Sequence, residues 1–192
     1  ILSAVVGARL YYVVFAWDQF ASHPLEIFNL RGGGLAIYGG VIGGIVSAVV
    51  YAKIKKKGFW LMADTACIGL ITGQIIGRFG NFFNKEAFGG YTDGLFAMAL
   101  PWDVAVSNMS ADSAAELAKY VENGVITVHP TFLYEAAWNL MVLLFMIFYT
   151  PHKKFHGEVF FIYLAGYGLG RAWIEGLRTD QLLLWNTSIP AS

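Results

Sequence analysis

The segment of residues 77–90, GRFGNFFNKEAFGG, holds the side chains of this chain that are best suited to chemistry. At the end of a roughly 20-residue apolar run, a length that crosses a lipid bilayer, it places Arg78, Asn81, Asn84 and Glu86. Charged side chains at membrane depth are costly and usually serve a function. The glycines of the segment predict a helix that breaks up around a polar cavity, with a sharp turn at Gly89-Gly90.

A second polar set lies near the end of the sequence. Tyr167, Arg171, Glu175 and Arg178 follow one another at i, i+4, i+8 and i+11, close to one face of a helix. Glu175 can pair with Arg171, orient its guanidinium group and offset its burial cost. We predict that this helix face and Arg78 form one site.

The two arginines Arg78 and Arg171 suit a particular ligand. A guanidinium group is planar, always charged and matched to phosphate by its paired donors. For a single arginine, ion pairing between helices or snorkelling to the membrane interface is the simpler interpretation. For the two arginines together we favour a bound phosphate and hence a lipid-handling enzyme.

Four further side chains have less specific roles. Glu135 could cap a helix or pair with an arginine, and His129 is a lone histidine with a surface or capping role. Tyr38 is either an interface aromatic or a hydroxyl that points into the cavity. Cys67, the single cysteine, lies in an apolar run where a thiol is inert, and it excludes an internal disulfide framework.

Other catalytic classes lack their motifs in this sequence. There is no HExxH, no CxxC, no carboxylate cluster with metal-ligand spacing and no GxSxG elbow. We therefore expect neither a metal nor an organic cofactor. The formal net charge is zero, so charge indicates no nucleic-acid partner.

Composition indicates the environment in which these residues act. Of the 192 residues, 57% are hydrophobic and 14% are charged, against about 25% charged in soluble domains. The aromatic fraction of 16% and the 22 glycines are typical of helices in lipid. Ile1 opens directly into an apolar run without a signal peptide, so we expect an interior fragment of a longer protein.

The apolar runs predict an all-α integral membrane protein, a polytopic helical bundle that forms one domain over residues 1–192. About five spans are expected, at residues 1–17, 34–52, 59–79, 132–150 and 159–177. Between the third and fourth spans, residues 84–131 are long enough for a small external α/β subdomain. It should contain an amphipathic helix at 110–121 and two short strands at 96–100 and 125–128.

Two patterns predict how the spans pack and point. Gly39, Gly40, Gly43 and Gly44 form a stripe that favours close helix packing over contact with a ligand. Six of the eight lysines lie in the loops 53–57 and 153–154, and short loops rich in lysine stay cytoplasmic. The ends of the spans that carry Arg78 and Arg171 should therefore face outside.

The polar segments together resemble a known family. Residues 77–90 are similar to the signature of bacterial prolipoprotein diacylglyceryl transferases. Four further pieces match in order, GARLYYV (7–13), GGLAIYGGVIGG (33–44), HPTFLYE (129–135) and YGLGRAWIEGLRTD (167–180). The resemblance covers nearly the whole chain, and the ordered set is highly specific.

The resemblance implies a seven-span enzyme of the bacterial cytoplasmic membrane, with its active site toward the outer side. Such enzymes move the diacylglyceryl group of phosphatidylglycerol onto the lipobox cysteine in the signal peptide of a preprolipoprotein, and release glycerol 1-phosphate. By motif, the arginines that hold the lipid head group are Arg78 and Arg171. The other matching positions of the signature and of the last motif are Asn81, Glu86, Gly89, Tyr167, Glu175 and Arg178.

The sequence offers three candidates for the group that accepts the proton of the substrate thiol. A free thiol is mostly protonated at neutral pH, so a base or an anion-stabilising group is needed. The candidates are Glu86, Tyr38 and the leaving phosphate. Some family members carry histidine where this chain has Tyr38, and the tyrosine argues against a universal histidine base.

Two other classes of function compete with a transferase. A transporter would use the broken helix at residues 77–90 as a solute site and would predict inverted repeats, which we do not find in the sequence. A membrane scaffold with structural ion pairs would explain the glycines but not the polar signatures at the outer side.

Overall fold

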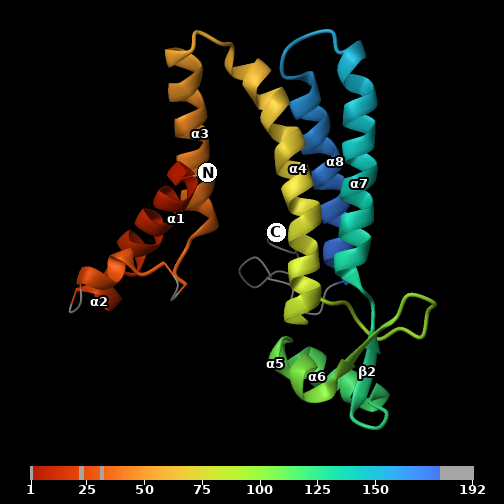
Figure 1. Cartoon of the computed structure of the whole chain (residues 1–192). Helices are drawn as coiled ribbons and strands as arrows, with labels where there is room; N and C mark the ends of the chain where they lie inside the picture. Colours follow the sequence, from red (N-terminus) through yellow and green to blue (C-terminus); the bar gives the residue numbers. More distant parts are fainter. Residues whose placement is uncertain (1, 22–23, 31–32, 178–192) are drawn as a thin grey trace. The chain divides into compact units, whose positions relative to one another are not determined.

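The computed structural model describes residues 2–21, 24–30 and 33–177, and within them the chain is mainly helical (Figure 1). The α-helices are α1 (Leu2–Phe15), α2 (Trp17–Phe20), α3 (Ile37–Ile54), α4 (Phe59–Asn84), α5 (Trp102–Ser107), α6 (Ala111–Leu117), α7 (Thr131–Tyr149) and α8 (Glu158–Ile174). Two strands, β1 (Met98–Pro101) and β2 (Val125–Val128), form an antiparallel sheet. Short 3₁₀ turns at Pro24–Phe28, Ala118–Tyr120, Thr150–His152 and Glu175–Leu177 complete the elements.

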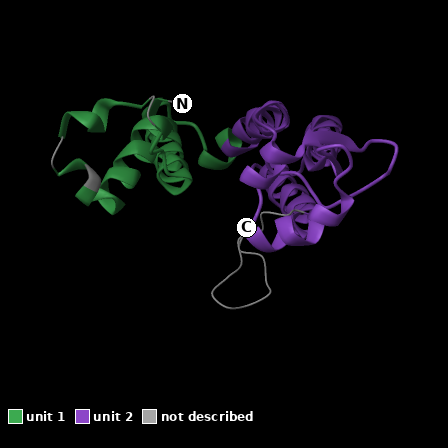
Figure 2. Cartoon of the chain, turned by 90° about the horizontal axis from the view of Figure 1, so that it is seen from below, with its two compact units in different colours: residues 1–62 green, residues 63–192 purple. Residues whose placement is uncertain are grey.

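The chain divides into two compact units, residues 1–62 and 63–192 (Figure 2). The first unit contains α1 to α3 and the second contains most of α4 and everything that follows. The two units are described separately below.

In the first unit, glycines allow α1 and α3 to touch. A Cβ atom added at Gly7 or Gly39 would collide with the main chain of the other helix, and one at Gly43 would collide with Ser3. Gly44, in contrast, has no neighbour within 4 Å of such an atom. The packing interpretation of the glycine stripe is therefore confirmed for Gly39 and Gly43, because only a residue without a side chain permits this approach.

In the second unit, α4, α7 and α8 lie side by side (Figure 1). Their shared core consists of Cys67, Ile71, Val142, Met146, Val159 and Tyr163. Cys67 is fully buried there, as expected for a packing residue. The apolar core gives way to charged residues toward the end of the three helices at which α4 finishes.

Asp64 fixes the opposite end of this bundle. Its carboxylate accepts hydrogen bonds from the main-chain N–H groups of Gly157 (2.9 Å) and Phe160 (3.0 Å), at the start of α8. It also forms an ion pair with Lys153 at 3.2 Å. A buried acid on α4 thus caps α8 and compensates its N-terminal dipole, which explains why a charge is tolerated early in a span.

Replacing Asp64 by alanine should lower stability by about 3 kcal/mol, because two helix N–H groups and a lysine lose their buried anionic partner. The stability of Asp64→Asn should lie between the stabilities of Asp64→Ala and the wild type, since an amide oxygen still accepts one hydrogen bond. Thermal melting of the full-length protein in detergent measures this order. An Asp64→Ala variant that melts with the wild type would contradict the capping role.

Three helical segments are long and apolar enough to cross a membrane, Ile37–Ile54, Phe59–Asn84 and Thr131–His152. The other two predicted spans correspond to shorter helices, the 14-residue α1 and the 17-residue α8. The predicted span at 159–177 ends as an α-helix at Ile174 and continues as a 3₁₀ turn. Many large apolar side chains of α3 are exposed, as lipid contact would require.

The predicted helix break within residues 77–90 is wrong at its start. Helix α4 continues regularly through Gly77 and Gly80 to Asn84, since a glycine weakens a helix without removing its hydrogen bonds. The chain turns afterwards, where Lys85 and Ala87 adopt positive φ angles. The predicted turn at Gly89-Gly90 corresponds to a bend at Gly90, and Gly89 allows a close approach between segments.

Residues between α4 and α7 form a small α/β layer. Strand β1 pairs with β2 from Met98–Val128 to Pro101–Val125, close to the two predicted strands. The predicted amphipathic helix is α6, which begins after its N-cap Ser110 and continues as a 3₁₀ turn to Tyr120. Helix α5 was not predicted from the sequence. The core under the layer consists of Phe88, Leu100, Ala105, Leu117, Ile126 and Val128.

Candidate active site

Glu135 joins the two predicted arginines. Its Oε2 atom lies 2.8 Å from Nε of Arg78 on α4 and 3.3 Å from Nη1 of Arg171 on α8. Glu135 itself is on the first turns of α7 and is only 3% exposed. Three helices therefore contribute one charged side chain each to a single cluster, and the predicted meeting of Arg78 with Arg171 is confirmed.

Glu175 completes this cluster, which we define as Arg78, Glu135, Arg171 and Glu175. It pairs with Nη2 of Arg171 one helical turn away, as the i, i+4 spacing predicts. The four formal charges sum to zero (+2 − 2), so the ion pairs between helices that we considered as an alternative are present. Binding of a phosphate by the arginines stays a prediction.

The cluster retains hydrogen-bonding capacity. The Nη atoms of Arg78 donate no hydrogen bond to any described residue. The side chains of Arg78 and Arg171 are 19% and 16% exposed, whereas Glu135 is buried. An oxyanion that approaches from the exposed side would find unused guanidinium donors that match its geometry.

A layer of neutral polar groups lies one helical turn deeper. Gln74 is four residues before Arg78, and Asn139 is four residues after Glu135 on the antiparallel helix. Gln74 donates a hydrogen bond to the hydroxyl of Tyr163 at 2.9 Å. This layer was not predicted from the sequence, although a single amide one helical turn from a charged residue in an apolar span is a signal for it.

The remaining residues of the 77–90 signature lie around the end of α4. Asn81 is one turn after Arg78, and its main-chain carbonyl accepts a hydrogen bond from the N–H of Glu86. Glu86 lies beyond the helix, where its Oε1 accepts a hydrogen bond from Asn84. Gly89 is buried and donates its N–H to the carbonyl of His129. Their roles toward a substrate remain predictions.

Three predicted site residues remain, namely Tyr167, Tyr38 and Arg178. Tyr167 stacks with the ring of Tyr163, one turn before Arg171 on α8. Tyr38 belongs to the first unit and is 73% exposed at the start of α3. Arg178 lies outside the described residues.

A cavity of about 430 Å³ borders the segment that follows Glu175. Its lining includes Gly176 and Leu177, His129, and side chains of α6 such as Glu116. His129 is also bonded to the hydroxyl of Tyr134 at 3.0 Å. The volume is within the range of about 300–1,000 Å³ that is typical of ligand pockets. The residues that directly follow Glu175 in the sequence therefore line a cavity large enough for a small ligand.

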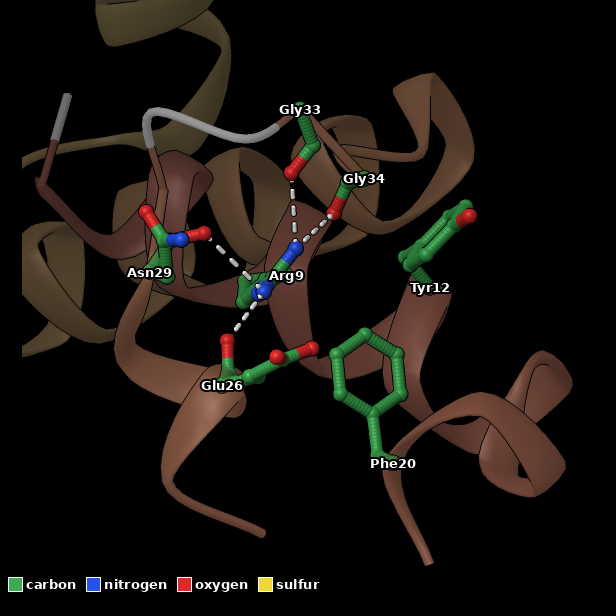
Figure 3. A pocket seen from close by; sticks show the side chains of 7 residues that line it. All are labelled: Arg9, Tyr12, Phe20, Glu26, Asn29, Gly33 and Gly34. Atoms are coloured by element: carbon green, nitrogen blue, oxygen red, sulfur yellow. Dashed lines mark hydrogen bonds between the residues drawn. The ribbon is translucent and has the colours of Figure 1, made fainter. Parts of the chain in front are cut away.

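Arg9, which belongs to the first unit, has a different environment (Figure 3). Its side chain donates to the carbonyl oxygens of Glu26, Ile27, Asn29, Gly33 and Gly34 at 2.6–3.1 Å. These bonds use all five N–H donors of a guanidinium group. Arg9 borders a small cavity of about 160 Å³ but has no donor left for a phosphate, so its role is to hold the loop before α3.

Replacing Arg9 by alanine should therefore loosen this loop, at a cost of about 3 kcal/mol or more, because five buried or part-buried carbonyls lose a charged donor. Arg9→Lys should loosen the loop less than Arg9→Ala does, since an ammonium group still has three donors. Limited proteolysis of residues 21–36 in the full-length protein reports the change. Unaltered cleavage in Arg9→Ala would contradict the structural role.

Comparison with known proteins extends these observations. The family model described as "Prolipoprotein diacylglyceryl transferase" matches residues 1–191. The proteins named phosphatidylglycerol–prolipoprotein diacylglyceryl transferase from Acaryochloris marina and Clostridioides difficile are each 43% identical, over 96% and 94% of this chain. The protein of that name from Trichormus variabilis is 44% identical over 96% of the chain.

The chain spans 63% of the length of each of these three relatives. The matches include all of the polar segments in which the cluster lies, and the apolar helices agree with a multi-pass membrane protein. The predicted fold class, a helical membrane bundle with a small α/β insertion, is confirmed, with the number of spans approximate. The chain belongs to the prolipoprotein diacylglyceryl transferase family.

Proposed function

We propose that the protein transfers the diacylglyceryl group of phosphatidylglycerol to the lipobox cysteine of a preprolipoprotein. The observation that carries the proposal is the meeting of Arg78 and Arg171 around Glu135, with the Nη donors of Arg78 unused among the described residues. Two guanidinium groups in one partly exposed cluster suit the phosphodiester of an anionic lipid. The names of the relatives supply the two substrates.

The reaction forms a thioether and breaks one phosphate ester. The cysteine sulfur attacks the glyceryl carbon that bears the phosphate, a C–S bond forms, and the C–O bond breaks. Its electron pair leaves with the phosphate as glycerol 1-phosphate. The phosphate gains negative charge as this bond breaks, so Arg78 and Arg171 stabilise the transition state more than the diester.

We further propose that the cluster faces the outer side of the bacterial cytoplasmic membrane. Lys153 and Lys154 lie in the loop between α7 and α8, at the opposite end of these helices from Glu135 and Arg171. The fifteen residue steps from Glu135 to Thr150 correspond to about 22 Å of helix. Loops rich in lysine remain cytoplasmic, which supports an outward-facing site.

The test combines the full-length protein with phosphatidylglycerol that is labelled in its diacylglyceryl part and a lipobox peptide. Label should appear on the peptide cysteine, with one glycerol phosphate released for each thioether. A peptide with serine in place of the cysteine should stay unlabelled. Labelling that is independent of the cysteine, or release of glycerol phosphate without transfer, would refute the proposal.

The transporter alternative has lost the feature that suggested it. It required a helix broken at residues 77–90, and α4 is continuous to Asn84. Solute flux in liposomes without labelling of the peptide would restore it.

A further inference from the structure

We propose that Glu135 accepts the proton of the substrate thiol, and that this protonation releases Arg78 and Arg171 to the leaving phosphate. The inference deepens the transfer reaction proposed above and rests on it. It adds a proton acceptor that the sequence motifs do not indicate, since they leave Glu86, Tyr38 and the phosphate as candidates.

The position of Glu135 carries the argument. Its Oε2 contacts both Arg78 Nε and Arg171 Nη1, while Oε1 has one long contact of 3.4 Å to Arg171. A phosphate held by both guanidinium groups therefore lies next to this carboxylate. In a near-attack geometry the sulfur is about 3–3.5 Å from the carbon joined to that phosphate. The thiol proton then reaches a carboxylate with accepting capacity left on Oε1.

The charges of the cluster explain why this acceptor would help catalysis. Before transfer, Arg78, Arg171, Glu135 and Glu175 sum to zero (+2 − 2). When the S–H proton moves to Glu135, the four side chains sum to +1 (+2 − 1). The sulfur lone pair then forms the C–S bond, and the ester C–O pair leaves with the phosphate, whose charge passes from −1 to −2. Positive charge thus becomes available as negative charge develops.

The other carboxylates considered in the second unit, Glu175 and Glu86, lack this position. Glu175 pairs with Arg171 and has no ion pair with Arg78 among the described residues. Glu86 lies beyond the end of α4 and bonds with Asn84. Within the described part of the chain, Glu135 is the carboxylate that pairs with both arginines.

The experiment compares two nucleophiles in the full-length protein. A lipobox peptide carries either cysteine or selenocysteine, and a selenol is largely ionised at neutral pH and needs no base. Glu135→Gln keeps the size of the side chain and an oxygen that accepts from the arginines. It should slow labelling of the cysteine peptide by at least about a hundredfold, and leave labelling of the selenocysteine peptide within about threefold of the wild type.

Equal slowing of both peptides would overturn the proposal, because it would assign Glu135 a purely structural role. An unchanged rate with the cysteine peptide would overturn it as well. Asp64→Asn is the matched control, since it removes another buried carboxylate, at the far end of the bundle, and should affect both peptides equally. A wild-type protein that labels neither peptide would refute the transfer reaction itself, which separates that failure from a failure of Glu135.

If Glu135→Gln does not fold, Glu135→Asp replaces it. This variant keeps the negative charge but withdraws the carboxylate by one methylene group. Labelling of the cysteine peptide should be at least about tenfold slower than in the wild type, and labelling of the selenocysteine peptide should keep its rate. A parallel loss with both peptides would again overturn the role.

Discussion

Replacing Arg78 by alanine in the full-length protein should reduce transfer of the diacylglyceryl group by at least about a hundredfold, which corresponds to about 3 kcal/mol of lost transition-state stabilisation. The guanidinium group forms an ion pair with Glu135 through Nε, and its Nη atoms donate no hydrogen bond to a described residue. They are the donors that we assign to the lipid phosphate. Label on the lipobox peptide, measured under single-turnover conditions, reports the loss.

Arg78→Lys distinguishes charge from geometry. It keeps the positive charge and the attraction to Glu135 but offers no planar fork, so its rate should lie between those of the alanine variant and the wild type. Lys119→Ala, which removes a cation from the α/β layer, should leave transfer unchanged. A fully active, folded Arg78→Ala protein would remove Arg78 from the head-group site.

Gly89→Ala should lower transfer by more than about tenfold and destabilise the protein by about 1–3 kcal/mol through overpacking. A Cβ atom at this position would lie 2.7 Å from the carbonyl oxygen of Leu177 and 2.8 Å from Cβ of His129. Relief of these overlaps requires the turn Glu175–Leu177 to move away. Glu175 would then no longer hold Arg171 in place.

The neighbouring glycine supplies the control for this prediction. A Cβ atom at Gly90 meets no atom within 4 Å, so Gly90→Ala should have nearly wild-type stability and activity. The melting temperature and peptide labelling of both variants are to be compared side by side. Equal behaviour of the two would show that the close approach at Gly89 has no part in arranging the site.

The Glu175–Arg171 pair illustrates what could be read from the sequence. Its partners are one helical turn apart, so the periodicity of a single helix is sufficient to predict the contact. The strands β1 and β2 were likewise predicted within two residues, because alternating apolar residues and a nearby Asn-Gly turn are local signals. Apolar length predicted the helices that can cross a membrane in the same way.

By itself, the sequence determined the helical membrane character of this protein, the polar segments that carry its arginines and the family to which they belong, because each depends on composition or on short spacing. Only the tertiary structure decided that Glu135 lies between Arg78 and Arg171, that Asp64 caps a helix 93 residues further along the chain, and that α4 continues through its glycines. These contacts depend on the register in which α4, α7 and α8 pack, with α7 antiparallel to the other two. That register is fixed by side-chain packing across the whole bundle, which no local spacing encodes.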